Sequence, residues 1–252
     1  ALREYAAAID GLERHRAVVG GSDDIRARWA AQFQDFYKEP LMLLARRGDA
    51  AGSAALERRY RAQALLRLLD SGAAAPAGWA GDEQVLDPAA ALAADQALLS
   101  LLIAPEGVVA LVWTPGRSLP HVVGIDMPAA QLDAAIRRLR LLAERAPDDP
   151  ASAQAFDRAS FALHSQLLGP LQPVLDRYPR WVLVADGALR QLPWAALAVD
   201  AGAMPRRLVE DHALLSAASP AVFALSRPAA GASDKVLGFA DVDVALAPRR
   251  DP

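Results

Sequence analysis

The stretch RWVLVADGALRQLPWAAL, residues 180–197, decides the fold class. Residues 181–185 form a continuous apolar run, which is typical of a central strand buried on both faces of an α/β sheet. Asp186 and Gly187 then turn the chain, and a Leu-Pro-Trp step follows. Ligand crevices of open α/β sheets lie beyond the carboxyl ends of the strands. Asp186 and Arg190 are therefore our candidates for lining a substrate cleft, with the alternative that Asp186 only shapes the turn through its side chain.

A β-hairpin and a third strand are expected upstream of this stretch. The apolar runs Leu98–Ile103 and Val108–Thr114 are joined by a short segment in which Pro105 and Gly107 supply turn geometry. Val122–Ile125 follows the next turn and predicts one more strand. The hydrophobic pattern thus changes from helical to strand-like at the first of these runs.

Two helices are predicted between the hairpin and the buried strand. Pro128 stands at a first helical position, where proline is favoured, and Pro147–Pro150 separates the first helix from the second. Gly169 and Pro170 end the second helix. Apolar residues at helical spacing predict the core faces: Leu132, Ile136, Leu139 and Leu142 in the first helix, and Phe156, Phe161, Leu163, Leu167 and Leu168 in the second.

The sheet is expected to continue after residue 197. Leu208–Ser216 predicts an edge strand, and Lys235–Phe239 predicts a further strand. Between them, Ser219 and Pro220 are suited to the N-cap and the first position of a helix. A sheet that stopped here would leave an edge of bare apolar backbone. We therefore expect the natural polypeptide or a partner chain to complete it.

The first 70 residues carry helical periodicity. Helices are expected over residues 2–19, 25–37 and 54–69, and Pro40 is expected to kink or interrupt the second of them. Two interpretations stay open. The helices are a small bundle that caps the next domain, or they are the last unit of a helical repeat array.

These signals divide the chain into three parts. Residues 1–72 form a helical segment, and residues 73–97 form a linker rich in Ala, Gly, Pro and Asp. Residues 98–252 hold the sheet. The predicted fold class is α/β, with N-terminal helical hairpins followed by an incomplete α/β sheet domain that carries an accessory β-hairpin.

Composition argues against several classes of function. The 252 residues carry a net charge of −3 and a pI of about 5.8, whereas nucleic-acid-binding domains are usually basic. Cysteine is absent, so these residues offer no disulfide, thiolate metal site or cysteine nucleophile. No apolar run approaches the ~20 residues of a spanning helix, and no signal peptide is visible. We expect a cytoplasmic protein without a membrane or nucleic-acid partner. Only Lys38 and Lys235 are lysines among 27 basic residues, which we attribute to base composition.

Familiar cofactor and catalytic motifs are absent. The sequence has no P-loop, no G-x-G-x-x-G, no H-E-x-x-H and no G-x-S-x-G elbow. We therefore predict no metal and no organic cofactor. His164 lies beside an apolar helix face and is interpreted as structural, while His212 is expected at a solvated turn or strand edge. A hydrolase that uses Asp and His is an alternative that no paired motif supports.

Three segments together resemble one known family. They are His164–Leu175 (HSQLLGPLQPVL), Trp181–Leu197 and Leu208–Leu225 (LVEDHALLSAASPAVFAL). This succession of a leucine-rich helix, a strand with a D-G-x-L-x-x-L-P step, and a helix after a serine is similar to the CHAT domain. That caspase-like domain is often joined to tetratricopeptide repeats in bacteria. The resemblance extends over residues 54–245, with Ala185 and Trp194 where the family usually has Pro and Phe.

The resemblance implies a caspase-like sheet in residues 98–252 and tetratricopeptide-like helices in residues 1–72. Caspase-like peptidases use a Cys nucleophile and a His base, in motifs that follow later strands than those present here. The implied function is the N-terminal, regulatory and substrate-cleft portion of a cysteine peptidase, without catalytic residues of its own. The implied partners are a protein or peptide substrate and the remainder of the domain, in cis or as a second chain.

A non-catalytic interaction module is the alternative function. In that case the helices and a caspase-like shell serve docking, and the incomplete sheet recruits a partner strand. A His-Gly and a later Cys-Gly signature after Pro252 would favour the peptidase, and their absence would favour the module.

Overall fold

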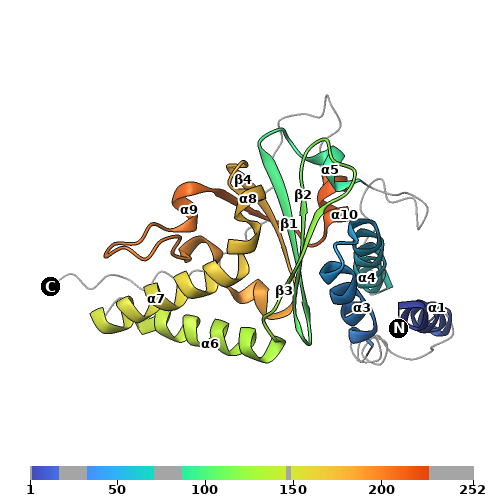
Figure 1. The fold of residues 1–252 in the computed structure, drawn as a ribbon, viewed down its shortest axis with the longest axis horizontal. Coiled ribbons are helices and arrows are strands. Elements are labelled where there is room, and N and C mark those ends of the chain that lie inside the picture. The colour runs from blue at the N-terminus through green and yellow to red at the C-terminus, as the bar shows by residue number, and fades with distance from the viewer. Residues whose placement is uncertain (1, 17–32, 71–86, 146–148, 227–252) are drawn as a thin grey trace.

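The computed structural model describes residues 2–16, 33–70, 87–145 and 149–226, which form a mixed α/β structure around a five-stranded sheet (Figure 1). The sheet order is β3-β2-β1-β4-β5. The strands are β1 (Gln96–Ala104), β2 (Gly107–Trp113), β3 (His121–Ile125), β4 (Arg180–Ala185) and β5 (Ala213–Ser216). The α-helices are α1 (Leu2–Arg16), α3 (Asp35–Arg46), α4 (Ala50–Asp70), α5 (Pro88–Ala91), α6 (Ala129–Arg145), α7 (Pro150–Leu167), α8 (Gln172–Leu175), α9 (Leu208–Asp211) and α10 (Pro220–Ser226). Short 3-10 helices are η1 (Gly169–Leu171), η2 (Gly187–Gln191) and η3 (Trp194–Ala196).

The predicted hairpin is present, but it is part of the main sheet. β1 and β2 pair antiparallel, and β2 and β3 continue this meander. On its other side β1 pairs parallel with β4, and β4 pairs parallel with β5. β1 is therefore the middle strand, which corrects the expectation of an accessory hairpin.

Helices cover both faces of the sheet (Figure 1). Strand residues alternate between the faces. Leu99 and Leu101 belong to the core beneath α6 and α7, whereas Leu102 belongs to the core with Leu41 and Met42 of α3. Because both faces are covered, the central strands β2 and β4 are buried and apolar on both sides, as the sequence predicted for the buried run in β4.

Two local expectations differ from the structure. Pro40 lies inside α3 and does not end it, because Leu41 and Met42 on the following turn are buried against the sheet and offset the lost backbone hydrogen bond. Residues 208–211 are the helical turn α9 rather than strand, because Glu210 accepts a hydrogen bond from the Arg207 N–H at 2.8 Å and caps that turn. β5 is therefore only four residues long.

Most of the predicted linker, residues 73–86, lies outside the described residues, and its described part, residues 87–97, is only partly irregular. Residues 88–91 form α5, whose N-cap Asp87 accepts a hydrogen bond from the Ala89 N–H at 2.9 Å. Residues 96 and 97 already belong to β1. The domain boundaries at 72, 73, 97 and 98 remain predictions.

Some expectations fall outside the described residues. These are the region between the first two predicted helices and most of the second, and the predicted strand Lys235–Phe239. The tetratricopeptide-like character of the N-terminal helices remains a prediction. None of the described helices combines the length and apolarity that crossing a bilayer requires.

Gly107 is a position where only glycine fits, and this predicts a measurable effect. A Cβ added there would lie 2.3 Å from the Ile125 carbonyl oxygen and 2.4 Å from Cε of Met42. Gly107→Ala should therefore lower the free energy of unfolding by roughly 1–3 kcal/mol, the usual cost of overpacking. Urea denaturation measures this change.

Gly169→Ala is the matched control, because nothing lies within 4 Å of the Cβ position at Gly169. Its effect should stay within about 0.5 kcal/mol. Equal destabilisation by the two substitutions would contradict the close approach between β2, β3 and α3.

Candidate functional site

The candidate site lies at the carboxyl end of β4. Val182 and Val184 belong to the core on the α4 side of the sheet, so the strand alternation directs Asp186 to that side as well. Gly187 follows with φ of +50°, a left-handed conformation that favours glycine. Asp186 is only 6% exposed.

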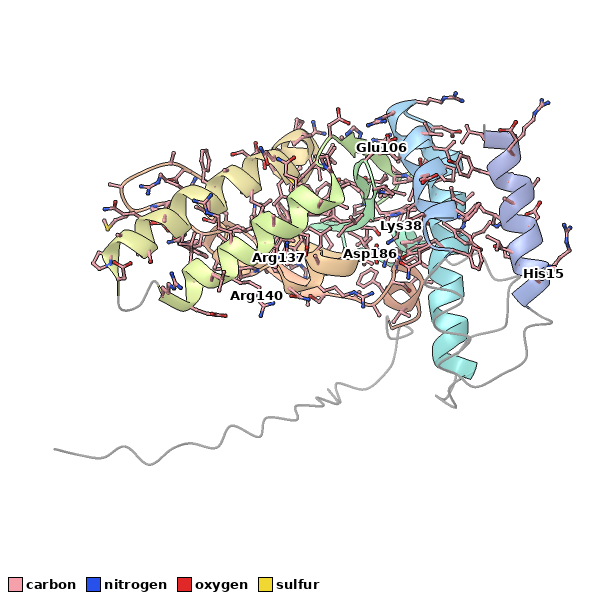
Figure 2. All side chains as sticks on the ribbon, turned by 90° about the horizontal axis from the view of Figure 1, so that it is seen from below. His15, Lys38, Glu106, Arg137, Arg140 and Asp186 are labelled. Atoms are coloured by element: carbon pink, nitrogen blue, oxygen red, sulfur yellow. The ribbon has the colours of Figure 1, made fainter. Side chains whose placement is uncertain are left out.

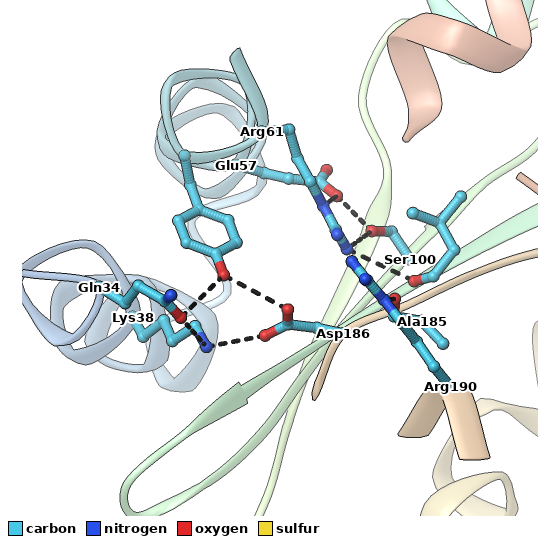
Figure 3. A network of polar contacts seen from close by, with 10 residues as sticks. Gln34, Lys38, Glu57, Arg61, Ser100, Ala185, Asp186 and Arg190 are labelled. Carbon is cyan, nitrogen blue, oxygen red and sulfur yellow. Dashed lines mark hydrogen bonds and ion pairs between the residues drawn. The ribbon is translucent and has the colours of Figure 1, made fainter. Parts of the chain in front are cut away.

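Asp186 is covered by two side chains from the helical segment. Nζ of Lys38, on α3, lies 2.8 Å from Oδ2 of Asp186. The hydroxyl of Tyr60, on α4, lies within hydrogen-bond distance of Asp186 Oδ1 at 3.3 Å (Figure 3). Figure 2 shows Lys38 and Asp186 close together where the helical segment meets the sheet.

Gln34 and the Tyr60 ring complete the surroundings of the ammonium group. Lys38 Nζ donates to Gln34 Oε1 at 3.2 Å, and it lies 5.4 Å from the centroid of the Tyr60 ring. The Tyr60 hydroxyl is also 3.4 Å from Gln34 Oε1. The Lys38 ammonium is therefore surrounded by a carboxylate oxygen, an amide oxygen and an aromatic ring.

A second buried pair lies beside the first. Glu57 and Arg61 are one turn apart on α4, with 3.9 Å between Arg61 Nε and Glu57 Oε1. Ser100 of β1 donates to Glu57, and Arg61 Nη2 donates to Ser100 Oγ at 3.3 Å and to the Val184 carbonyl at 3.4 Å (Figure 3). In their ionised forms the two pairs together carry no net charge, which limits the cost of burying them.

The environment shifts the pKa values in different directions. Burial alone would raise the pKa of Asp186, but the charge of Lys38 and its contact with Asp186 outweigh this and lower that pKa. Burial would likewise lower the pKa of Lys38, and Asp186 reverses this and raises it. The pair is thus held in its ionised form. For Glu57, burial dominates over the charge of Arg61 and raises the pKa.

The structure places the two predicted cleft residues differently. Arg190 is exposed on η2, and its Nε donates to the Ala185 carbonyl at 3.1 Å. Asp186 lies beneath α3 and α4 instead. Both are at the carboxyl end of β4, but they do not share one open surface, and their contact with a substrate remains a prediction.

Sequence reasoning missed the partners of Asp186. Lys38 is one of only two lysines in a chain that otherwise uses arginine, and this signal was available. Glu57 and Arg61 are an i, i+4 pair of opposite charge on the same helix face as the buried Ala54. Opposite charges on an otherwise buried helix face were a second signal in the sequence.

The histidines do not form a catalytic group with Asp186. His164 is buried on α7, and burial lowers its pKa. The His212 ring is half-buried and stacks on Trp181 with centroids 4.0 Å apart, which corrects the expectation of a solvated position. In the described part of the chain, no three His, Asp or Glu side chains gather as metal ligands.

A family model described as "CHAT domain" matches residues 157–249. The matched segment begins within α7 and includes β4, Asp186, Arg190, β5 and α10, whereas Lys38 and Tyr60 precede it. No curated protein matches the chain.

The buried ion pair predicts strong coupling between Lys38 and Asp186. Lys38→Met or Asp186→Asn should each lower the free energy of unfolding by about 3–5 kcal/mol, because each leaves the partner buried without its counter-charge. The double variant should lose less than the sum of the two. Urea denaturation of the four proteins gives the coupling energy, and additive losses would contradict a direct pair.

Glu57 predicts a pH dependence of stability. Its pKa is raised in the folded protein above the ordinary value of 4.5, so its contribution to stability is complete below about pH 4.5 and is lost as the pH rises through the folded pKa. Glu57→Gln cannot ionise. The free energy of unfolding of this variant, minus that of the wild type, should therefore increase with pH above 4.5 and then level off.

Glu144→Gln on the exposed side of α6 is the control for this measurement. Its difference from the wild type should change much less over the same pH range. A flat profile for Glu57→Gln would mean that the folded protein does not hold the Glu57 proton to higher pH.

Proposed function

We propose that this chain, whose residues 157–249 are CHAT-domain sequence, provides the helical and substrate-cleft part of a caspase-like peptidase. The family match is the observation that carries the proposal. The position of Arg190 supports it further, because Arg190 is exposed near the carboxyl end of β4, and the carboxyl ends of sheet strands are where ligand crevices lie in α/β folds. The resemblance assigns a protein or peptide as the substrate.

The nucleophile in this proposal comes from residues other than these 252, since the sequence contains no cysteine. A thiolate supplied there attacks the peptide carbonyl, and a His protonates the leaving amine. Water then hydrolyses the acyl-enzyme. The present residues contribute binding and shape to the cleft, not the reacting groups.

The helical segment has a regulatory role in this proposal. Side chains of α3 and α4 contact the end of β4 directly, through Lys38, Tyr60 and Arg61. A partner that displaces these helices changes the surroundings of Asp186 and of the turn that follows it. Binding to the helices and the geometry of the cleft are coupled in this way.

A docking module without peptidase activity is the second candidate. Two features favour it. β5 is a short strand at the edge of the described sheet, with Leu215 47% exposed. An apolar hollow of about 250 Å³ lies between α1, α3 and α4, lined in part by Ile9, Leu44 and Leu56. An extended strand of a partner could pair with β5, and an apolar side chain of a partner could enter the hollow.

Alkylation of the intact natural protein separates these candidates. The protein is purified from its native source, treated with iodoacetamide and analysed by denaturing mass spectrometry. A chain that contains this sequence, or is bound to it, should take up the label on a reactive thiol and should cleave peptide substrates. A complex that takes up no label and cleaves nothing would reject the peptidase and leave the docking module.

Arg190→Ala in that peptidase tests the cleft. We expect a lower kcat/KM, because Arg190 fixes the turn after β4 and is exposed at its surface. Arg137→Ala is the control, since Arg137 pairs with Asp133 on the same helix, α6. Unchanged kinetics for Arg190→Ala would remove this residue from the cleft.

A further inference from the structure

The surroundings of Lys38 suit one chemical group. Its Nζ contacts Oδ2 of Asp186 at 2.8 Å and Oε1 of Gln34 at 3.2 Å, and it lies near the face of the Tyr60 ring. An ammonium is a compact cation with three donors, which matches two acceptors and a ring placed around one point. Lys38 is only 8% exposed, so water contributes little to its solvation.

Arginine does not fit this arrangement equally well. A guanidinium is planar and presents its donors in a rigid fork that suits paired carboxylate oxygens. Only Oδ2 of Asp186 faces the cation, while Oδ1 lies near the Tyr60 hydroxyl. The use of lysine here, in a chain whose 27 basic residues are otherwise arginine except for Lys235, agrees with a requirement for the smaller group.

We propose that Asp186, Gln34 and Tyr60 form a recognition site for a primary ammonium group, which Lys38 fills in cis as an internal ligand. The ligand class is an alkylammonium, of which the lysine side chain of a peptide is the biological form. This assignment does not depend on peptidase activity.

The position of Lys38 in the chain explains why the site is occupied in the folded protein. Lys38 stands in the first turn of α3, which begins at Asp35. A tethered ligand has a high effective concentration, so a free ammonium cannot compete with Lys38 while that turn is in place. The site becomes available to another lysine only when the start of α3 moves or when position 38 loses its amine.

Removing the internal ligand tests the site on the full 252-residue chain. Lys38→Ala leaves space for the four-carbon side chain and its ammonium. n-Butylammonium chloride should raise the Tm of this variant in a saturable way, and n-butylguanidinium should do so with affinity lower by on the order of tenfold. The wild type, whose site is filled, should show no saturable shift. Calorimetric titration of Lys38→Ala gives the two affinities directly.

Asp186 provides the specificity control. The double variant Lys38→Ala, Asp186→Asn retains the space but lacks the acid, and it should bind neither cation. Equal rescue by butylammonium and butylguanidinium, or rescue of the double variant, would overturn an ammonium site. No saturable binding to Lys38→Ala would overturn it as well.

Lys38→Arg and Lys38→Met keep the test decisive if Lys38→Ala does not fold. Lys38→Arg retains the charge, and under the proposal it should still lower the Tm to nearly the value of Lys38→Met. If Lys38→Arg is instead as stable as the wild type, the site accepts any cation and the proposal is wrong. A negative result in these binding and Tm measurements says nothing about a reactive thiol in the natural protein. The proposed function is therefore tested separately, by the alkylation experiment.

Discussion

The ion pair between Lys38 and Asp186 is a direct, buried polar link between the helical segment and the sheet. It links the first turn of α3 to the carboxyl end of β4, and both side chains are nearly excluded from water. Burial of this kind is tolerated only because the charges are matched and hydrogen-bonded. Arg61 and Glu57 form a second buried pair at the same interface, although there burial outweighs the charge of Arg61 and raises the pKa of Glu57. The helices therefore cannot shift relative to the strand without uncovering charge.

Apolar packing sets the position of the helices, and the polar pairs define their register. Leu41 and Met42 pack on the strands but tolerate small displacements, since apolar contacts have little directional preference. The 2.8 Å contact between Lys38 and Asp186 does not tolerate such displacements, because an ion pair at this distance depends on the positions of both groups. The polar pairs thus contribute specificity of position rather than stability, since an apolar core at the same place would be at least as stable.

The period of the hydrophobic residues was enough to predict the hairpin, the helices α6 and α7, and the buried strand β4. These elements are long, and each is apolar at a regular spacing. The turn at residues 208–211 was mistaken for strand because a single capping contact from Glu210 decides it. The partners of Asp186 were not predicted, since the contact with Lys38 joins residues far apart in the chain and leaves no local pattern. The resemblance to the CHAT domain was confirmed over residues 157–249.

The place of β1 in the middle of the sheet has a consequence for synthesis on the ribosome. β1, β2 and β3 pair through short local turns and are able to form as soon as they emerge. The other edge of β1 has to wait for β4, which is made only after α6 and α7. During that interval a largely apolar strand presents unpaired backbone groups, and such edges promote aggregation. The nascent chain thus passes through a stage in which early coverage by α3 and α4 limits the exposure of β1.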